Sequence, residues 1–409
     1  MIRRHPAFAR ALRAAWLGAL AVLLAACASG PTRPDPAPLP PSPNLLGVRQ
    51  AWSVEQGEVN FPLVVQAVGN TVGVASGDGN VSLLDARTGE VMWRASVGAP
   101  LIAGVGEDGQ TAAVVTRENE LVALQDGREL WRQRLGAPSY TPPLVAGARV
   151  FVLGADRSVS AYDGQSGRRL WSQTRSGEPL VLREPGVLIA VGDTLVVGLS
   201  GRLVGMNPLN GSARWEVPIA SPRGTNDVER LVDLVAGVSR QGSVVCARAF
   251  QAAVGCVDTA RGALLWSKPA AGATSLSGDA DLVFGVEFDG TLVAWKRGDG
   301  ERAWTMNQLR YRKLTAPLLM GPTLVVGDDE GRLHFFARQD GALQLRFEVA
   351  GPAFLALPSL SSEFVLDDRQ QNRVDADRRA IAAAPVRVGN TLVVVTRAGR
   401  VLGLRPESE

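Results

Sequence analysis

Residues 194–215 read TLVVGLSGRLVGMNPLNGSARW and contain one full copy of a repeated sequence pattern. The copy starts with a short run of β-branched and aliphatic residues, turns at a glycine, and continues with a second apolar run. A second turn then ends at Gly211, and a last segment carries Trp215. Short runs of β-forming residues between glycine turns are typical of strands. This stretch therefore predicts three successive antiparallel strands.

The same pattern recurs along the chain. A glycine stands four residues before a tryptophan six times, and the tryptophans follow one another at intervals of 38 to 51 residues: Gly89/Trp93, Gly127/Trp131, Gly167/Trp171, Gly211/Trp215, Gly262/Trp266 and Gly300/Trp304. An Asp or Asn often precedes the glycine by four and can bond its own turn, while the tryptophan is a large apolar anchor. With a fourth linking strand, each unit of about 40 residues predicts one blade of a β-propeller.

Two incomplete copies bring the number of blades to eight. A seventh unit spans 315–347, with Leu345 in the place of the tryptophan. An eighth unit at 389–404 lacks its tryptophan strand, whereas Val48-Arg-Gln-Ala-Trp52 is such a strand without a unit. Pairing these two ends closes the ring and leaves no open sheet edge. We therefore predict an all-β fold, an eight-bladed β-propeller over residues 45–409 closed by its N- and C-terminal strands, with seven blades as the alternative.

Two segments interrupt the period of the repeat. Residues 220–234 lengthen one connection between tryptophan strands. Residues 358–383 are polar and contain no tryptophan strand, so we expect an exposed loop there.

The N-terminus has the features of an export signal. Four arginines and no acidic residue precede an apolar run at 14–24, which is too short for a membrane-spanning helix. The following Leu24-Ala25-Ala26-Cys27 resembles the lipobox of bacterial lipoproteins. That resemblance implies a signal peptide at 1–26, lipid attachment at Cys27 and, with Ala28 in place of Asp, a periplasm-facing lipid anchor in the outer membrane. The alternative is an ordinary signal peptide. Residues 27–44, rich in proline, predict an extended, solvated spacer.

The charge balance argues against a nucleic-acid partner. The full chain has 43 Lys and Arg against 40 Asp and Glu. Removal of residues 1–26 leaves 39 basic residues, and no dense basic block is present. A nucleic-acid-binding surface needs a basic excess or a basic face.

Few residues suit catalysis or cofactor binding. His334 is the one histidine beyond the signal and lies in a strand-like run, so we expect a structural role for it and no histidine-based metal site. The glycine motif Gly104-Val-Gly106-Glu-Asp-Gly109 is followed by a β-forming run rather than a helix, which argues against a dinucleotide site. We predict no cofactor, no metal and no enzymatic activity.

Cys246 and Cys256 are the only cysteines besides Cys27. They lie ten residues apart on consecutive predicted strands, where paired positions approach closely enough for a disulfide, and an exported protein meets oxidising conditions. The sequence leaves a disulfide and two buried thiols equally open.

The lipobox, the proline spacer and the repeated tryptophan units together resemble the BamB family of the outer-membrane β-barrel assembly machinery, over nearly the whole mature chain. Two local motifs sharpen the resemblance: Leu180-Val-Leu182-Arg183 before the fourth blade and Arg230-Leu-Val-Asp233 before the fifth. Where family members carry a second acidic residue in the latter motif, this chain has Val235.

The resemblance implies a non-catalytic scaffold that binds the periplasmic POTRA region of BamA, contacts nascent outer-membrane proteins, and aids their assembly and insertion. It carries the BamA-binding role onto the following residues: Leu180, Leu182, Arg183, Arg230 and Asp233. Two leucines beside an arginine suit a docking surface, although leucines here also fit the core of a blade.

Two alternatives remain. Quinone-dependent dehydrogenases share the repeat, but they usually carry adjacent cysteines, which this sequence lacks. A propeller lipoprotein of another envelope complex is the second, and the two local motifs argue against it.

Overall fold

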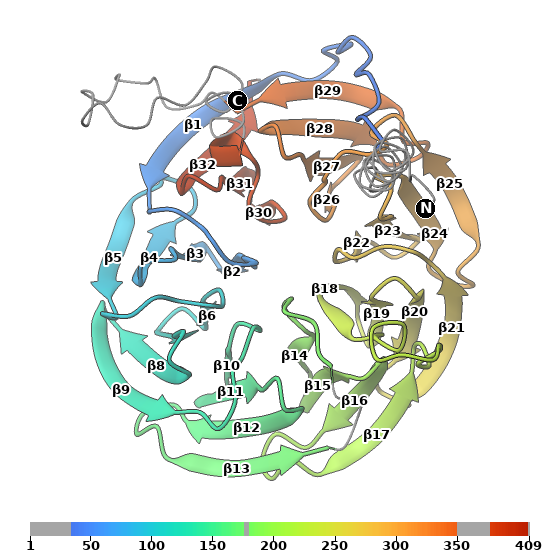
Figure 1. Cartoon of the computed structure of the whole chain (residues 1–409). Coiled ribbons are helices and arrows are strands. Elements are labelled where there is room, and N and C mark those ends of the chain that lie inside the picture. The colour runs from blue at the N-terminus through green and yellow to red at the C-terminus, as the bar shows by residue number, and fades with distance from the viewer. Residues whose placement is uncertain (1–33, 176–179, 350–376, 408–409) are drawn as a thin grey trace, which may run out of the picture.

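The computed structural model describes residues 34–175, 180–349 and 377–407. Eight four-stranded antiparallel sheets stand around a common centre (Figure 1). The predicted eight-bladed propeller is confirmed, and the alternative of seven blades is wrong.

Each of the first seven blades is an antiparallel meander whose first strand lies nearest the centre and whose last strand lies at the rim (Figure 1). Numbered along the chain, the blades contain β2 (Gln66–Val68), β3 (Thr71–Ala75), β4 (Asn80–Asp85) and β5 (Val91–Ser96) in the first; β6 (Gly106–Glu107), β7 (Thr111–Val115), β8 (Glu120–Gln125) and β9 (Arg128–Arg134) in the second; β10 (Leu144–Ala146), β11 (Arg149–Leu153), β12 (Ser158–Asp163) and β13 (Arg169–Thr174) in the third; β14 (Leu188–Val191), β15 (Thr194–Leu199), β16 (Arg202–Met206) and β17 (Ala213–Pro218) in the fourth; β18 (Leu234–Gln241), β19 (Val244–Ala249), β20 (Ala253–Asp258) and β21 (Ala263–Pro269) in the fifth; β22 (Ser277–Gly278), β23 (Leu282–Val286), β24 (Leu292–Lys296) and β25 (Arg302–Met306) in the sixth; β26 (Leu318–Met320), β27 (Thr323–Gly327), β28 (Arg332–Ala337) and β29 (Leu343–Glu348) in the seventh; and β30 (Val386–Val388), β31 (Thr391–Val395), β32 (Arg400–Pro406) and β1 (Val48–Glu55) in the eighth.

The two ends of the chain share the eighth blade. Strand β1 pairs antiparallel with β32, from Val48 opposite Pro406 to Glu55 opposite Arg400. The predicted closure is therefore confirmed. Leu345 also occupies the expected tryptophan position. It pairs with Phe335, and the strand register shifts directly after Phe335. In the first blade the register shifts in the same way directly after Leu83, the partner of Trp93.

The hydrophobic core lies between the blades. In the described part of the chain it divides into eight clusters, and each cluster combines buried side chains of two neighbouring blades. A single four-stranded sheet buries too little surface to be stable alone, so each blade depends on both of its neighbours.

The glycine and the tryptophan of the repeat meet across these interfaces. The indole N–H of Trp52 donates to the carbonyl of Ala86 in the next blade at 3.1 Å. Gly89 has φ near +75°, and a Cβ added there would lie 2.6 Å from the Trp52 ring. The same arrangement joins Trp131 to Gly167. Each motif glycine therefore receives the tryptophan of the preceding blade.

The acidic residue of the motif closes its own turn, as predicted. The Asp163 carboxylate accepts the backbone amides of Gln165 and Ser166, at 3.2 and 2.9 Å.

The described part of the predicted spacer, residues 34–44, forms no strand. Most of these residues are exposed, but the segment also contacts the ring: the Arg346 guanidinium donates to the carbonyl of Pro40 at 2.8 Å, and Leu39 packs against the core between the sixth and seventh blades. Composition does not reveal these partners, because they lie about 300 residues away in sequence.

Two predicted features lie largely or wholly outside the described residues. Cys27 and the signal peptide are outside them, as is most of the expected loop at 358–383. At the described end of that loop, Ala380, Ile381 and Ala383 are buried. Among the residues that the structure describes, no helix is long and apolar enough to cross a membrane.

Candidate partner-binding site

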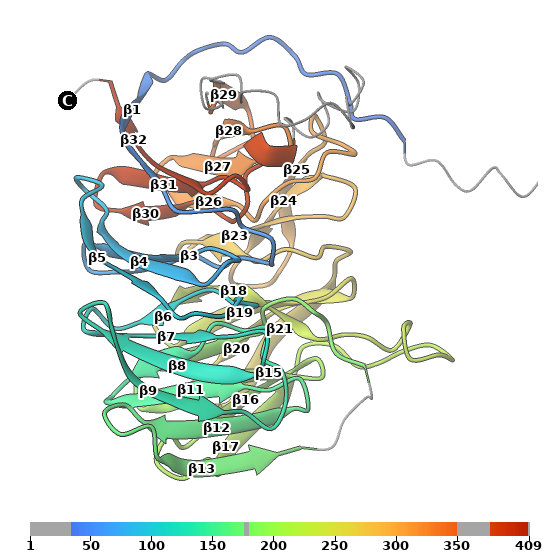
Figure 2. The same ribbon diagram turned by 60° about the vertical axis from the view of Figure 1, so that its left-hand side comes forward.

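The sequence places the candidate binding residues on two connections, one before β14 and one between β17 and β18. Figure 2 shows the yellow-green connection between β17 and β18 projecting from the ring. It spans residues 219–233. Its end contacts the segment before β14, since the Asp233 carboxylate accepts the backbone amide of Leu182 at 3.0 Å. The structure therefore brings the two motifs together.

Arg157 joins the same contact from the third blade. Its guanidinium donates to Asp233 Oδ1 at 3.1 Å and to the carbonyl of Leu180 at 2.9 Å. The side chain of Arg157 is 7% exposed and that of Asp233 is 17% exposed. Hydrogen bonds between charged groups are stronger than neutral ones, and more so where water is largely excluded. Both carboxylate oxygens of Asp233 therefore accept hydrogen bonds from within the protein, and these bonds position the loop.

Sequence reasoning missed Arg157, although the repeat contains a signal for it. Arg157 has φ near +63° in the turn between β11 and β12. Glycine fills the equivalent turn position of several other blades, including Gly79 and Gly331. A large side chain in this left-handed conformation costs about 1–2 kcal/mol. Because several other blades have glycine at this position, the presence of an arginine indicates that its side chain has a specific role.

Further bonds fix the loop to the ring. The amide of Gly186 donates to Thr141 Oγ1 at 2.9 Å, and the amide of Ala236 donates to the carbonyl of Pro185 at 2.7 Å. Only a small cavity of about 50 Å³ remains beneath it, lined in part by Leu182 and Asp233. The loop is therefore attached to the ring at several points.

The remaining candidate residues differ in exposure. Leu180 is 41% exposed, Arg183 is exposed, and Leu182 is half-buried between them. Arg230 is half-buried on the second connection, two residues beyond Val228, which is 72% exposed. Of these side chains, arginine is the type that is enriched at interface hot spots, which makes the exposed Arg183 the strongest candidate for a direct contact.

A larger cavity of about 690 Å³ opens among the first strands of the fifth to eighth blades. Its lining is mainly small and aliphatic, and none of the described residues that line it is aromatic. A flat ring cofactor would therefore find no aromatic stacking partner there. The described ranges also contain no group of three or more His, Cys, Asp and Glu side chains that could hold a metal ion.

His334 is fully buried in β28, and its Nε2 lies 2.9 Å from Asp328 Oδ2. Burial lowers the pKa of His334 from its ordinary value, while the hydrogen bond and charge of Asp328 act in the opposite direction. A fully buried imidazole in contact with a buried carboxylate suits a structural role.

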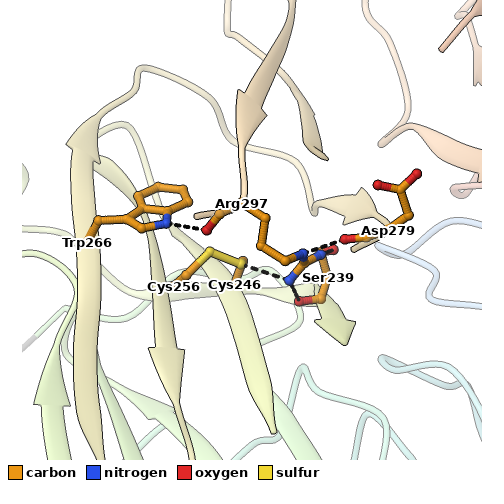
Figure 3. The surroundings of a disulfide bond; sticks show 6 residues. All are labelled: Ser239, Cys246, Cys256, Trp266, Asp279 and Arg297. Atoms are coloured by element: carbon orange, nitrogen blue, oxygen red, sulfur yellow. Dashed lines mark hydrogen bonds between the residues drawn. A yellow bond between two sulfur atoms is a disulfide. The ribbon is translucent and has the colours of Figure 1, made fainter. Parts of the chain in front are cut away.

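Cys246 and Cys256 occupy directly paired positions of β19 and β20 and are joined by a disulfide (Figure 3). Both residues are fully buried. The guanidinium of Arg297, in the next blade, lies 3.1 Å from Cys246 Sγ and also donates to Ser239. The disulfide therefore lies inside the interface between the fifth and sixth blades.

Comparison with known proteins shows which family has sequences similar to this chain. A family model described as outer membrane protein assembly factor BamB matches residues 77–306. The outer membrane protein assembly factor BamB of Burkholderia pseudomallei is 33% identical over 95% of this chain and 96% of its own length. That of Bordetella pertussis is 33% identical over 86% of this chain and 94% of its own length.

Solved structures agree on the fold. The structure of BamB from Moraxella catarrhalis superposes with a TM-score of 0.74 at 22% identity, over 88% of this chain and 99% of that one. A quinohemoprotein alcohol dehydrogenase from Comamonas testosteroni superposes with a TM-score of 0.62 at 14% identity, over 88% of this chain and 77% of its own. At such identities the likeness concerns the fold alone.

Proposed function

Since the chain belongs to the BamB family of outer membrane protein assembly factors, which is a non-catalytic family, we propose that it binds the periplasmic POTRA region of BamA through the loop at 180–184. Leu180 and Arg183 make the direct contact, with Leu182 between them. Asp233 and Arg157 hold this loop in its binding conformation. Arg230 extends the surface along the second connection.

The observation that carries this proposal is the support beneath the loop. Two segments about 50 residues apart are joined by one partly buried carboxylate and one buried guanidinium, while the side chains of Leu180 and Arg183 remain exposed. A rigid loop loses little conformational entropy on binding, which favours affinity.

We further propose that acyl chains on Cys27 anchor the protein in the outer membrane with the ring in the periplasm. Each buried methylene contributes about 0.8 kcal/mol to such an anchor. Bound in this way, the protein would hold the assembly machinery together, contact nascent outer-membrane proteins, and aid their insertion.

The test is a pull-down of the full lipoprotein in detergent against purified periplasmic domains of BamA. Arg183→Glu reverses one exposed charge and should weaken binding at least about tenfold, since loss of a hot-spot contact costs about 2 kcal/mol. The matched control is Arg168→Glu, at an exposed arginine in the turn between β12 and β13. Equal binding by both variants would refute this site, and no binding by the unmodified chain would refute BamA as the partner.

A further inference from the structure

The segment at 37–46, which we call the strap, lies along the seventh blade. In Figure 1 the blue chain before β1 runs outside β29. The amide of Leu45 donates to the carbonyl of Gln344 at 2.8 Å, and the amide of Arg346 donates to Ser42 Oγ at 2.9 Å. The strap therefore covers part of the free edge of β29, which would otherwise expose unpaired backbone groups.

Two arginines of the ring hold the strap by its carbonyls. Arg346 donates to Pro40 at 2.8 Å, and Arg312 donates to Ala37 at 3.2 Å. Arg312 is only 8% exposed. In the opposite direction, the amide of Ala37 donates to the carbonyl of Arg310 at 2.9 Å. Charged donors make strong hydrogen bonds, so these contacts fix the strap at several points along its length.

Comparison with the other blades shows that Arg346 bonds to the strap, whereas the equivalent arginines of the first two blades bond to the preceding blade. The equivalent arginine of the first blade, Arg94, donates to the carbonyl of Glu55 in the preceding blade at 3.0 Å. That of the second blade, Arg132, donates to Val97 in the preceding blade at 2.8 Å. In the seventh blade the strap supplies the acceptor instead. Leu39 adds an apolar contact at the interface of the sixth and seventh blades.

We propose that the strap is a fixed part of the ring and that the rim at the sixth and seventh blades therefore faces the lipid surface. The inference rests on the proposed anchor at Cys27. The ten residues from Cys27 to Ala37 span at most about 35 Å, whereas the 21 residues from Cys27 to Val48 would span about 75 Å as a free spacer. A docked strap thus brings one side of the ring close to the membrane and keeps the opposite side away.

Two exposed glutamines in equivalent turns test the orientation. Gln339 lies in the turn between β28 and β29 of the seventh blade, and Gln165 lies in the matching turn of the third blade, opposite in the ring. A donor dye is attached to Gln339→Cys or Gln165→Cys in the acylated full chain, bound to vesicles of phosphatidylethanolamine and phosphatidylglycerol with a headgroup acceptor. We expect at least about twofold more energy transfer from position 339. Equal transfer from both positions would overturn the proposal.

The double variant Leu39→Asp/Arg346→Ala removes the apolar contact and the arginine contact of the strap, and should abolish the difference in energy transfer. Arg94→Ala removes the equivalent arginine of the first blade and should preserve it. A difference that persists in the double variant would show that the strap does not set the orientation.

Hydrogen exchange on the full chain separates the strap from the anchor. The amides of Ala37 and Leu45 should exchange at least about tenfold more slowly than in the double variant. Rapid exchange at both amides in the unmodified chain would refute the strap. Failure of the unmodified chain to pellet with vesicles would instead refute the anchor of the proposed function, while slow exchange would still establish the docked strap.

Discussion

Arg157 illustrates how one residue is selected for its side chain against the preference of its backbone. Its positive φ favours glycine, yet its guanidinium joins Asp233 to the carbonyl of Leu180. The backbone conformation of Arg157 thus lowers local stability, but its side chain positions a loop that begins 23 residues later in the chain.

Substitution of Arg157 should separate these two effects. Arg157→Ala leaves the Asp233 carboxylate without its ion-pair partner and should lower the free energy of unfolding by about 1–3 kcal/mol. Arg157→Gly loses the same bonds but relieves the backbone, so it should be more stable than the alanine variant by about 1 kcal/mol. Denaturant titration measures both.

The control for this pair is Arg117→Ala, in the equivalent turn of the second blade, where the arginine is exposed. It should change stability by less than about 0.5 kcal/mol. Alanine and glycine variants of equal stability at position 157 would contradict the backbone argument.

His334 should make the stability depend on pH. Because burial depresses its pKa in the folded state, the unfolded chain binds the proton more readily. Stability is therefore fully present above the ordinary pKa of 6.5, and it is lost as pH falls below that value toward the folded pKa.

Urea titrations between pH 5 and pH 8 measure this dependence, with His334→Gln as the reference. Glutamine retains an amide donor for Asp328 but does not titrate. The slope of stability against pH below 6.5 should be smaller in His334→Gln than in the original chain. Identical slopes would show that other groups cause the dependence.

At the scale of the element, the contact between a glycine turn and the preceding tryptophan explains the repeat. Gly89→Ala places a methyl group against the Trp52 ring in addition to straining the backbone. Gly98 provides a matched control, since its φ is near +72° but nothing lies within 4 Å of an added Cβ.

Gly98→Ala should therefore lower the free energy of unfolding by about 1 kcal/mol, the backbone cost alone. Gly89→Ala should cost a further 1–3 kcal/mol, roughly the range for overpacking. Thermal and denaturant unfolding of both variants provide the comparison. A similar loss of stability in both variants would mean that the Trp52 ring moves aside at no cost in free energy.

The hairpin of β19 and β20 makes the redox state of its cysteines measurable. We expect Cys246 and Cys256 to be bonded in the exported protein. Denaturation without reductant should then expose neither thiol to a thiol reagent. The double variant Cys246→Ala/Cys256→Ala should be less stable by about 2–3 kcal/mol, given the ten-residue separation. Two reactive thiols in the denatured, unreduced chain would contradict the bond.

At the scale of the whole molecule, the ring depends on the junction between its termini. Trp52 on β1 contacts Gly403 on β32 and Gly89 of the first blade, so it spans the point where the chain closes. Trp304 docks on the seventh blade in the same way, with its indole N–H 3.0 Å from the carbonyl of Arg338, but the chain is continuous there.

Trp52→Ala and Trp304→Ala should each cost about 3–5 kcal/mol, as expected for a large aromatic side chain. Hydrogen exchange should distinguish them. Trp52→Ala should increase exchange mainly in β1 and in the first and eighth blades, because the ring can open there. An even increase over all blades in both variants would show that closure is no weaker than the other interfaces.

The number of blades, the closure of the ring and the family could all be predicted from the amino-acid sequence. These features are encoded locally: alternating strands, turn residues and a glycine four positions before a tryptophan are read within about 40 residues. The resemblance also singled out two short motifs, which contain Leu180, Leu182, Arg183, Arg230 and Asp233, and the structure brings these motifs into contact.

The groups that meet across the ring could be identified only in the folded chain. Arg157 reaches Asp233 over 76 positions, and Arg346 reaches Pro40 over 306. The sequence revealed neither contact, because no local pattern records a contact whose two halves lie on different blades. Such contacts depend on how the blades pack against one another. They join residues at irregular separations along the chain, so the sequence repeat does not predict them.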